Sequence, residues 1–362
     1  MKIYKMESFI LSIPLDRPFR GGRQQPRERI NPVILKLTVD DGIDAFGLAF
    51  AWNDRQVKSL KASIDDLEYM IIGQDVFRWA EAWQRLYNGT RHMGHHGYGI
   101  YALAAIDTAL WVLRAKALGM PLAHLLGGFR ERVPAYASHM LFRNWSIDEL
   151  QKDAASLVKQ GFRAMKMNMG DKPFKAEIER LKAVQEAVGE DIDILIDVNW
   201  AWTVAETIKI GREIERYQAY WIEDPLDSDD PDQLSQVSQA LGVPIAAGET
   251  YCTKYEFRNL IEKRAADILI IDLQRVGGIT AWLKVATVAE TWNLPVASHL
   301  FHDFSMHLIA AIPNGLFVEY MPWWDVIYQE PPQVKDGYIE IPKVAGLGFD
   351  LDPEALKKYE LK

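Results

Sequence analysis

Seven side chains that can ionise or bind a metal follow short apolar runs in the second half of the chain. They are Lys166, Asp197, Glu223, Glu249, Asp272, His299 and Glu319. One acid after a strand is weak evidence of chemistry, because many such acids only cap the next helix. Seven in succession at the same place are difficult to explain in that way. The pattern indicates that successive strand ends converge on one site.

Three of these residues, Asp197, Glu223 and Glu249, are carboxylates on consecutive predicted strands. Neighbouring strand ends lie side by side, so the three negative charges would repel one another unless a cation neutralised them. Oxygen ligands suit a hard cation, and three carboxylates leave room for water and substrate oxygens, as Mg²⁺ prefers. We therefore predict a Mg²⁺ site, the alternative being three separate surface ion pairs.

Asp272 and His299 follow two other consecutive predicted strands. A carboxylate beside an imidazole fixes the tautomer of the ring and raises its basicity, which gives a general base usable near neutral pH. Asp272 alone could be a loop cap, and most single histidines are structural. Together, facing a metal, the two favour catalysis. Glu319, if protonated, could donate a hydrogen bond to a developing enolate oxygen.

The strands that would position these residues are predicted by eight short apolar runs, which alternate with amphipathic helical stretches such as 205–216. The runs cover residues 133–137, 162–167, 192–197, 220–223, 243–248, 268–272, 294–298 and 316–320. Eight such runs fit a closed parallel barrel better than an open sheet. An open dinucleotide-binding sheet is disfavoured because no G-x-G-x-x-G motif follows a first strand.

The chain before about residue 125 mixes strand and helix signals. An apolar, β-branched run over 33–39 ends at Asp40-Asp41-Gly42, as a strand does in a hairpin. Residues 101–117 are rich in Ala and Leu at helical spacing, which predicts a buried helix. The tail after about residue 325 lies outside the alternation and is expected to pack on the N-terminal unit.

The composition is that of an ordinary globular protein of a size that suits a barrel plus a second unit. The 362 residues carry a net charge of −9, which argues against a nucleic-acid or anionic-membrane partner. Cys252 is the single cysteine, so an internal disulfide is excluded and a reducing cytoplasm is the expected setting. The N-terminus does not read as a signal peptide, and apolar runs fall short of the roughly 20 residues of a membrane helix.

With these motifs in place, the chain resembles the enolase superfamily and, within it, the mandelate racemase subgroup. The resemblance spans essentially the whole length and is densest over 161–320. The family's motif for strand two is matched by 161–168. Its three metal-ligand motifs are matched by Asp197-Val-Asn199, Trp221-Ile-Glu223-Asp224-Pro225 and Gly248-Glu249. Its catalytic dyad and electrophile are matched by 276–280 after Asp272 and by 298–301 leading to Glu319.

This resemblance implies an α/β fold in which an α+β capping domain built from both termini covers a modified TIM (β/α) barrel. The capping domain would comprise residues 1–125, the barrel 126–325, and a C-terminal segment, 326–362, would return to the cap. The resemblance also implies Mg²⁺, a small-molecule carboxylate substrate that is enolised, and a homo-oligomer.

One position departs from the family's pattern. Racemases of the family carry Lys-x-Lys on the second strand, whereas this chain has Lys166-Met167-Asn168. Asparagine cannot accept a proton near neutral pH, so a racemase with two bases is disfavoured. Members with Lys-x-Asn resemble sugar-acid dehydratases. We therefore expect a hydro-lyase that converts an aldonate or aldarate to a 2-keto-3-deoxy acid, with His299 as the base.

Alternatives to this reaction stay open. Lys166 could neutralise the substrate carboxylate or the enolate, or it could be a second base. In the latter case the protein would be a racemase or epimerase, or a lactone cycloisomerase, of a 2-hydroxy acid. A barrel that only binds a ligand is a remote alternative, because the metal ligands, dyad and electrophile are all present. A zinc hydrolase is disfavoured because no His-x-His ends the first strand.

Several further residues are candidates for substrate contacts. Those expected near the strand ends are Ser138, His139, Asn168 and Asn199. A loop that carries Arg20, Arg23, Arg27 and Arg29 around Gly21-Gly22 could bind a polyhydroxy carboxylate, or could simply be solvated. His92, His95 and His96 could form another substrate wall or be exposed loop residues. Trp323 and Trp324 could roof the site or only pack against it.

Overall fold

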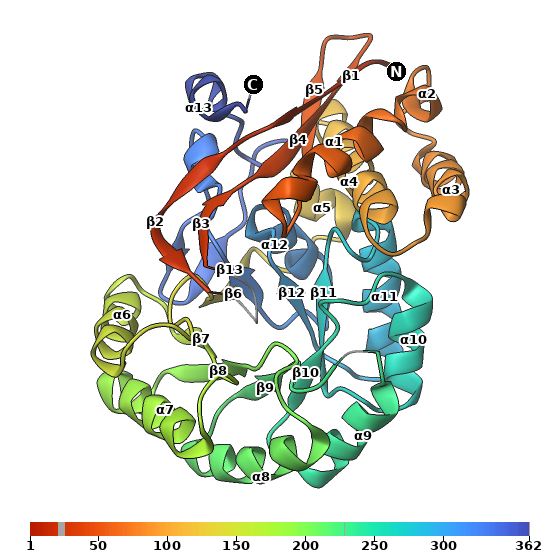
Figure 1. Cartoon of the computed structure of the whole chain (residues 1–362). Helices are drawn as coiled ribbons and strands as arrows, with labels where there is room; N and C mark the ends of the chain where they lie inside the picture. The colour runs from red at the N-terminus through yellow and green to blue at the C-terminus, as the bar shows by residue number, and fades with distance from the viewer. Residues whose placement is uncertain (21–25, 228, 362) are drawn as a thin grey trace.

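The computed structural model describes residues 1–20, 26–227 and 229–361 and shows a ring of parallel strands beneath a separate antiparallel sheet (Figure 1). The ring consists of β6 (Arg132–Ala137), β7 (Ala164–Asn168), β8 (Asp193–Asp197), β9 (Trp221–Glu223), β10 (Ile245–Ala247), β11 (Ile268–Asp272), β12 (Val296–His299) and β13 (Val318–Tyr320). These strands follow one another in order from β12 to β6, and β13 pairs with β6.

The ring closes between β12 and the segment that enters β13. The Ser298 amide donates to the Phe317 carbonyl at 3.0 Å, and the Leu316 amide donates to the Val296 carbonyl at 2.7 Å. Seven helices connect the strands: α6 (Ile147–Lys159), α7 (Phe174–Val188), α8 (Val204–Ile214), α9 (Pro231–Ala240), α10 (Lys254–Glu262), α11 (Ile279–Thr291) and α12 (His302–Ala311). In the described part of the chain, β13 leads into a short 3₁₀ turn, η4 (Asp325–Ile327), instead of an eighth helix. The predicted modified (β/α) barrel is therefore confirmed.

The inside of the barrel is filled with side chains. Tyr136, Trp221 and Phe317 pack edge to face, with ring centroids of Tyr136 and Trp221 5.5 Å apart and those of Trp221 and Phe317 6.1 Å apart. The rest of this inner cluster is aliphatic: Ala164, Leu195, Ala246, Ile268, Ile270 and Ala297. Such a core leaves no pore and forms a solid floor under the strand ends.

The N-terminal part forms the capping domain. Its sheet runs β1-β4-β5, and β2 and β3 form a separate pair. The elements are β1 (Ile3–Ile10), β2 (Ile13–Phe19), β3 (Arg27–Ile30), β4 (Pro32–Val39), β5 (Asp44–Phe50), η1 (Asp54–Gln56), α1 (Val57–Asp65), α2 (Glu68–Ile71), α3 (Trp79–Gly89), η2 (Arg91–Met93), α4 (Tyr98–Ala117) and α5 (Leu122–Leu126). The expected strand over 33–39 and helix over 101–117 are confirmed as β4 and α4.

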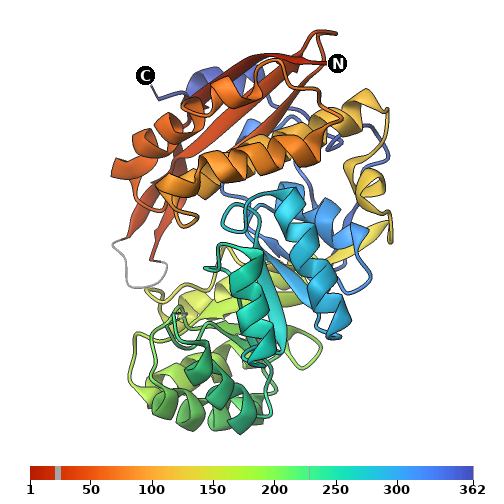
Figure 2. The ribbon, with the colours of Figure 1, turned by 90° about the vertical axis from the view of Figure 1, so that its right-hand side faces the viewer.

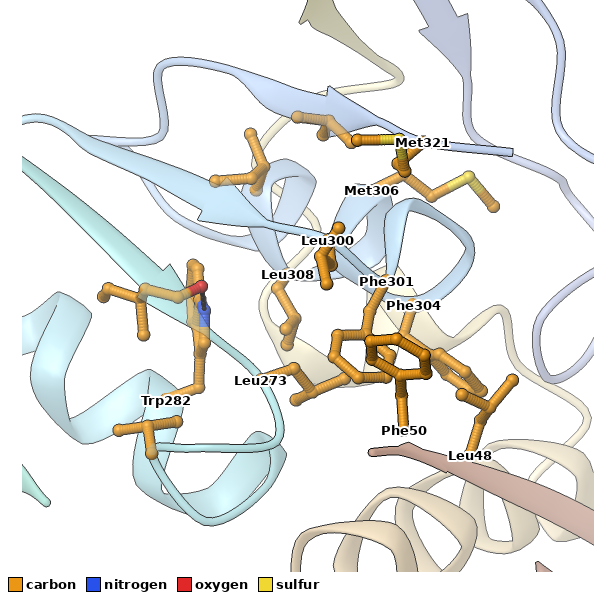
Figure 3. Close-up of a cluster of buried hydrophobic side chains, with 14 of the residues drawn as sticks. Leu48, Phe50, Leu273, Trp282, Leu300, Phe301, Phe304, Met306, Leu308 and Met321 are labelled. Carbon is orange, nitrogen blue, oxygen red and sulfur yellow. Dashed lines mark hydrogen bonds between the residues drawn. The ribbon is translucent and has the colours of Figure 1, made fainter. Parts of the chain in front are cut away.

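Apolar side chains join the capping domain to the barrel. Leu48 and Phe50 of β5 point toward Phe301 and Phe304, which lie at the start of α12 (Figure 3). Phe50 is also fixed by polar contacts, because its amide donates to the Gln274 side chain at 2.6 Å and its carbonyl accepts from the same side chain at 3.0 Å. Figure 2 shows the cap sheet and α4 on the same side of the barrel. The cap therefore packs directly on the loops that follow the barrel strands.

The C-terminal segment has two parts. The hairpin of β14 (Val334–Lys335) and β15 (Tyr338–Glu340) pairs antiparallel with β6, so it extends the barrel sheet. Beyond it, α13 (Pro353–Tyr359) reaches the capping domain, where the Ser12 amide donates to the Tyr359 carbonyl at 2.8 Å. Among the helices of the described residues, none has the length and apolar character needed to cross a membrane.

Candidate active site at the barrel mouth

Six of the seven ionisable residues point into the mouth of the barrel because of the strand's two-residue period, whereas the seventh, Glu249, follows Gly248 beyond the end of β10. Side chains two apart on a strand point to the same side. Leu195, Trp221 and Phe317 belong to the packed interior, and each is followed two positions later by Asp197, Glu223 or Glu319. The same step leads from Ala164 to Lys166, from Ile270 to Asp272 and from Ala297 to His299. Along these strands, the inward side chains thus change from apolar in the interior to ionisable at the mouth of the barrel.

Lys166 lies among carboxylates on the floor of the site. Its Nζ is 3.0 Å from Glu223 Oε1, 3.3 Å from Asp197 Oδ2 and 2.7 Å from Glu319 Oε1. All four side chains are buried. Burial alone would lower the pKa of Lys166, but the carboxylates of Glu223 and Glu319 outweigh it and raise the pKa well above its usual value. The raised pKa and the three ion pairs thus favour the ammonium form of Lys166.

Glu319 is correspondingly an acceptor at both oxygens. Ser138 Oγ donates to Oε1 at 2.6 Å and the Leu300 amide donates to Oε2 at 2.6 Å. Burial would raise the pKa of Glu319, but Lys166 and His299 outweigh it and lower the pKa to about 2. The expected role of Glu319 as a hydrogen-bond donor is conditional on its protonation, and the lowered pKa favours its carboxylate form instead.

The three predicted metal ligands form a connected arc. Asp197 and Glu223 are direct neighbours in the parallel pairing of β8 and β9, and Glu249 follows β10, the next strand. Burial and the neighbouring acids raise the pKa of Glu223 well above its usual value, although Lys166 lowers it. Together with Glu319, these buried carboxylates outnumber the nearby cations Lys166 and Arg275, and such an oxygen donor set suits a hard divalent cation. The residues present therefore fit Mg²⁺.

Asp272 and His299 are paired as predicted. They are register partners on β11 and β12, and His299 Nδ1 lies 2.5 Å from Asp272 Oδ2. The other ring nitrogen, Nε2, faces Glu249 Oε2 at 3.3 Å. Burial would lower the pKa of His299, but Glu249 and the bond to Asp272 outweigh it and raise the pKa. This orientation directs Nε2 toward the carboxylates of the cavity.

A cavity of about 90 Å³ opens above these groups. Its polar floor consists of Ser138, Lys166, Asn168, Asp197, Asn199, Glu249, Arg275, His299 and Glu319. Its remaining wall is apolar or aromatic: Phe19 and Trp52 come from the cap, and Phe142, Trp200, Leu300, Met321 and Trp323 come from segments that follow barrel strands. A small molecule with an anionic end would place that end on the floor.

Three of the predicted substrate contacts line this cavity. Asn168 donates its amide to Asp197 Oδ2 at 3.1 Å, and Ser138 is bonded to Glu319. Asn199 accepts from the buried Arg143 at 2.9 Å through its side-chain oxygen. Each of these side chains is therefore oriented by a charged neighbour.

Other candidates lie elsewhere. Arg20 pairs with Asp171, with Nη1 3.4 Å from Oδ2, and does not belong to the cavity lining among the described residues. His139 lies two residues beyond the end of β6, and its ring packs near Phe162 and Tyr320. Burial lowers the pKa of His139 to about 4. These contacts separate both residues from the cavity.

The remaining candidates belong to the arginine loop, the histidine segment and the tryptophan pair. Arg23 lies outside the described residues. Arg27 pairs with Asp54 at 3.1 Å, and Arg29 donates to Ser12 Oγ at 2.8 Å. Trp323 lines the cavity, whereas Trp324 is fully buried and donates to Asp303 at 3.0 Å. For the residues described, the lining of this cavity lacks His92, His95 and His96.

Sequence reasoning missed two charged groups at the site. Arg275 donates to the Glu249 carbonyl at 2.7 Å, and its own amide donates to Asp272 Oδ1 at 2.6 Å. It thereby connects the dyad to the third carboxylate. Asp224 accepts from Trp200 Nε1 at 3.0 Å, and burial together with Glu249 raises its pKa well above the usual value. Arg275 stands three residues after Asp272, a spacing that could have signalled a turn bond.

The fold and the carboxylate floor define a barrel protein built to hold a hard cation against an anionic small molecule. Comparison with known proteins identifies its family. Residues 9–127 match the mandelate racemase / muconate lactonizing enzyme N-terminal domain, and residues 149–355 match the enolase C-terminal domain-like family. The chain therefore belongs to the enolase superfamily, in its mandelate racemase subgroup.

Similar proteins share nearly the full length. L-talarate/galactarate dehydratase from Salmonella typhimurium is 30% identical over 341 residues, which are 94% of this chain and 85% of that protein. Arabinonate dehydratase from Saccharolobus solfataricus is 29% identical over 91% of each chain. A racemase from Streptomyces coelicolor, solved with bound magnesium, is 27% identical with a TM-score of 0.95 over 99% of this chain and 100% of that one.

Proposed function

We propose that this protein is a Mg²⁺-dependent hydro-lyase that converts an aldonate or aldarate to a 2-keto-3-deoxy acid. The proposal rests on the contacts made by Asn168 and Lys166 on the second barrel strand, β7. Asn168 donates to Asp197, and the Lys166 ammonium is held by three carboxylates. Among the described residues of the cavity, His299 is then the remaining strong base. Two relatives with dehydratase names support the same reaction class.

Asp197, Glu223 and Glu249 would hold the Mg²⁺ ion. The fit rests on their clustering at consecutive strand ends and on their all-oxygen donor set. When bound, the ion would stabilise the negative charge that develops on the substrate carboxylate as the neighbouring carbon is deprotonated. The magnesium in the similar racemase structure supports this assignment.

His299 would remove the proton from C2 of the substrate through Nε2. Asp272 holds Nδ1 and so keeps the acceptor nitrogen directed at the cavity. The electron pair of the broken C2–H bond forms the C2–C3 double bond, and the 3-hydroxyl leaves as water by taking a proton from the protonated His299. The resulting enol takes a proton from solvent at C3 and releases the proton of its 2-hydroxyl, which gives a 2-keto-3-deoxy acid.

Lys166 and Arg275 supply positive charge to the same cavity. An ammonium that is already ion-paired on the floor attracts the carboxylate end of a substrate and cannot accept a proton from it. Glu319 anchors this ammonium and is itself fixed by Ser138 and the Leu300 amide. The geometry thus favours one-base elimination over two-base racemisation or cycloisomerisation.

A panel of aldonates and aldarates, incubated with the Mg²⁺-loaded protein, tests the proposal directly. We expect at least one acid to give a 2-keto acid, and we expect excess chelator to stop the reaction and added Mg²⁺ to restore it. Turnover that continues unchanged in metal-free protein would remove the metal from the proposal.

The proposal extends to the cellular location, the assembly and the partners of the protein. We propose a cytoplasmic protein, because its single cysteine suits a reducing compartment. We further propose a homo-oligomer, which rests on family resemblance alone. The acidic net charge of −9 supports the absence of nucleic-acid and membrane partners.

A further inference from the structure

A second cluster of metal-binding side chains lies outside the catalytic cavity. Cys252 and Glu256 belong to the barrel, in the loop before α10 and in the first turn of that helix. His96 belongs to the capping domain, in the loop between η2 and α4. One donor atom from each side chain lies within 4.8 Å of the donor atoms of the other two. Segments about 155 residues apart in the sequence thus bring sulfur, nitrogen and oxygen donors together.

Glu256 lies between the other two residues. Its Oε1 is 2.9 Å from His96 Nε2, and its Oε2 accepts the Cys252 amide hydrogen at 2.8 Å. Cys252 is buried, whereas the His96 side chain is 72% exposed. The cluster is therefore closed on the barrel side and open to solvent on the cap side, so an ion can enter.

The loop that carries His96 is anchored rather than free. The ring of His95 stacks on Tyr87 with centroids 3.8 Å apart, and its Nε2 lies 2.9 Å from the Tyr87 carbonyl oxygen. Gly94 and Gly97 flank the pair, each with a φ of 85°, a conformation that favours glycine. This short, anchored loop directs His96 toward Glu256.

We propose that His96, Cys252 and Glu256 form a binding site for a borderline-soft divalent cation of the Zn²⁺ class, which clasps the capping domain to the barrel. Thiolate, imidazole and carboxylate are the ligands that Zn²⁺ uses, and three of them leave the fourth tetrahedral position to water. Mg²⁺ prefers oxygen donors alone, so it would select the catalytic carboxylates instead.

Binding at this site must displace a proton. Burial raises the pKa of Cys252 to about 12, so the thiol is protonated at neutral pH. The incoming cation forms a bond to Sγ, and the thiol proton passes to solvent. The affinity for the cation therefore increases with pH.

The place of the clasp gives it a structural role. Cys252 stands three residues after Glu249, and His96 stands two residues before α4, the long helix of the cap. A cation held there would join the cap to the edge of the barrel mouth without touching the catalytic floor. Because it would bind the folded protein alone, it would raise the thermal unfolding midpoint.

Cobalt(II) titration of the Mg²⁺-saturated protein, under a reductant that is not a thiol, tests the site. A thiolate ligand gives Co²⁺ a charge-transfer absorption in the near ultraviolet, which oxygen ligands of the catalytic site do not. We expect this band to reach saturation at one Co²⁺ per chain and to be removed by one equivalent of Zn²⁺. Absence of the band would overturn the proposal.

Variants assign the ligands. Cys252→Ser should lose the band, and His96→Gln should weaken Co²⁺ binding by at least about 100-fold, since even partners outside the ligand shell contribute 10 to 100-fold. His92→Gln is the matched control, because His92 is an exposed histidine of the same segment, and it should bind as the wild type does. Unchanged Mg²⁺-dependent turnover in Cys252→Ser would show an intact fold. A band that persists in Cys252→Ser, or equal affinity in His96→Gln, would contradict the assignment.

Discussion

We expect Asn168 to determine which type of reaction this site catalyses. Its amide donates to Asp197 Oδ2 at 3.1 Å, at a strand position where racemases of the family carry a lysine. An amide cannot take a proton from carbon. Lys166, on the same strand, is already shared among three carboxylates. Among the described residues of the cavity, we therefore expect a base only on the side that His299 occupies.

Replacing Asn168 by lysine should supply the missing base. We expect Asn168→Lys to introduce slow C2 epimerisation of a substrate, while elimination falls by at least about tenfold because a second cation disturbs Asp197. NMR of the substrate pool would measure both. Asn168→Gln, which keeps an amide, is the control and should give no epimer. Epimerisation by the glutamine variant would show that the base lies elsewhere.

The His299–Asp272 pair should behave as one unit. Each of His299→Asn and Asp272→Asn is expected to lower kcat by orders of magnitude, and the double variant by little more, because residues that act together are not additive. Steady-state kinetics with circular dichroism as a check on folding would measure this. Small losses that add in the double variant would mean that the pair is structural.

Individual residues show how far the sequence could predict the site. The sequence could predict Asp197, Glu223 and His299 because each follows an inward apolar residue by two positions. His139 was misplaced because it lies beyond the end of β6, where its ring packs near Phe162 and Tyr320. The sequence could not predict that Lys166 rather than Glu319 holds the proton, since this depends on distances between strands that are far apart in the sequence.

Helix α4 of the cap holds the start of α11 of the barrel. Asp107, which is fully buried, accepts the Thr280 amide at 2.8 Å and the Thr280 hydroxyl at 2.7 Å. Gly278 precedes this contact with a φ of 87°, and a Cβ there would approach Asp107 Oδ2 to 2.6 Å. The glycine is therefore required for the close approach of the two elements.

This contact should make stability depend on pH. Burial outweighs the bonds from Thr280 and raises the pKa of Asp107 from 3.8 to about 7. Between these values the folded protein holds a proton that the unfolded chain has lost, so the contribution of Asp107 to stability falls as pH rises from about 4 to about 7. Urea unfolding at several pH values should show this decline relative to Asp107→Asn. Parallel pH profiles for the two proteins would contradict it.

Elements were predictable where the pattern was local. All eight barrel strands were expected within a few residues, including β9 and β10, which have only three residues each, because apolar runs mark them. The replacement of an eighth helix by η4 was not predicted. It depends on Trp324 and its partner Asp303, which are brought together by folding.

At the scale of the whole molecule, the cap closes the mouth of the barrel. Phe19 and Trp52 from the cap complete the cavity wall, and Phe50 is bonded to Gln274 across 224 positions of sequence. Such pairings have no local signal, so the resemblance, rather than the residue pattern, predicted the capping domain. The split of the C-terminal segment between barrel and cap likewise follows from the pairing of β15 with β6.

Mg²⁺ should stabilise the whole protein as well as activate it. At a concentration of 100 times Kd, an ion that binds only the folded state contributes about 2.7 kcal/mol. We expect Mg²⁺ to raise Tm in the wild type and not in Glu223→Gln, which removes one charge from the carboxylate arc. Differential scanning calorimetry would measure it, with turnover as a second readout. An equal rise in Tm for both proteins would place the ion elsewhere.

The most direct test of the account is the fate of the C2 hydrogen in D₂O. One-base elimination predicts that a sugar-acid substrate becomes a 2-keto-3-deoxy acid with one deuterium at C3, while recovered substrate shows a single C2 configuration. Proton and carbon NMR of the same reaction would report both. Recovered substrate that carries deuterium at C2 in both configurations, without keto acid, would contradict the account and make Lys166 a competent second base.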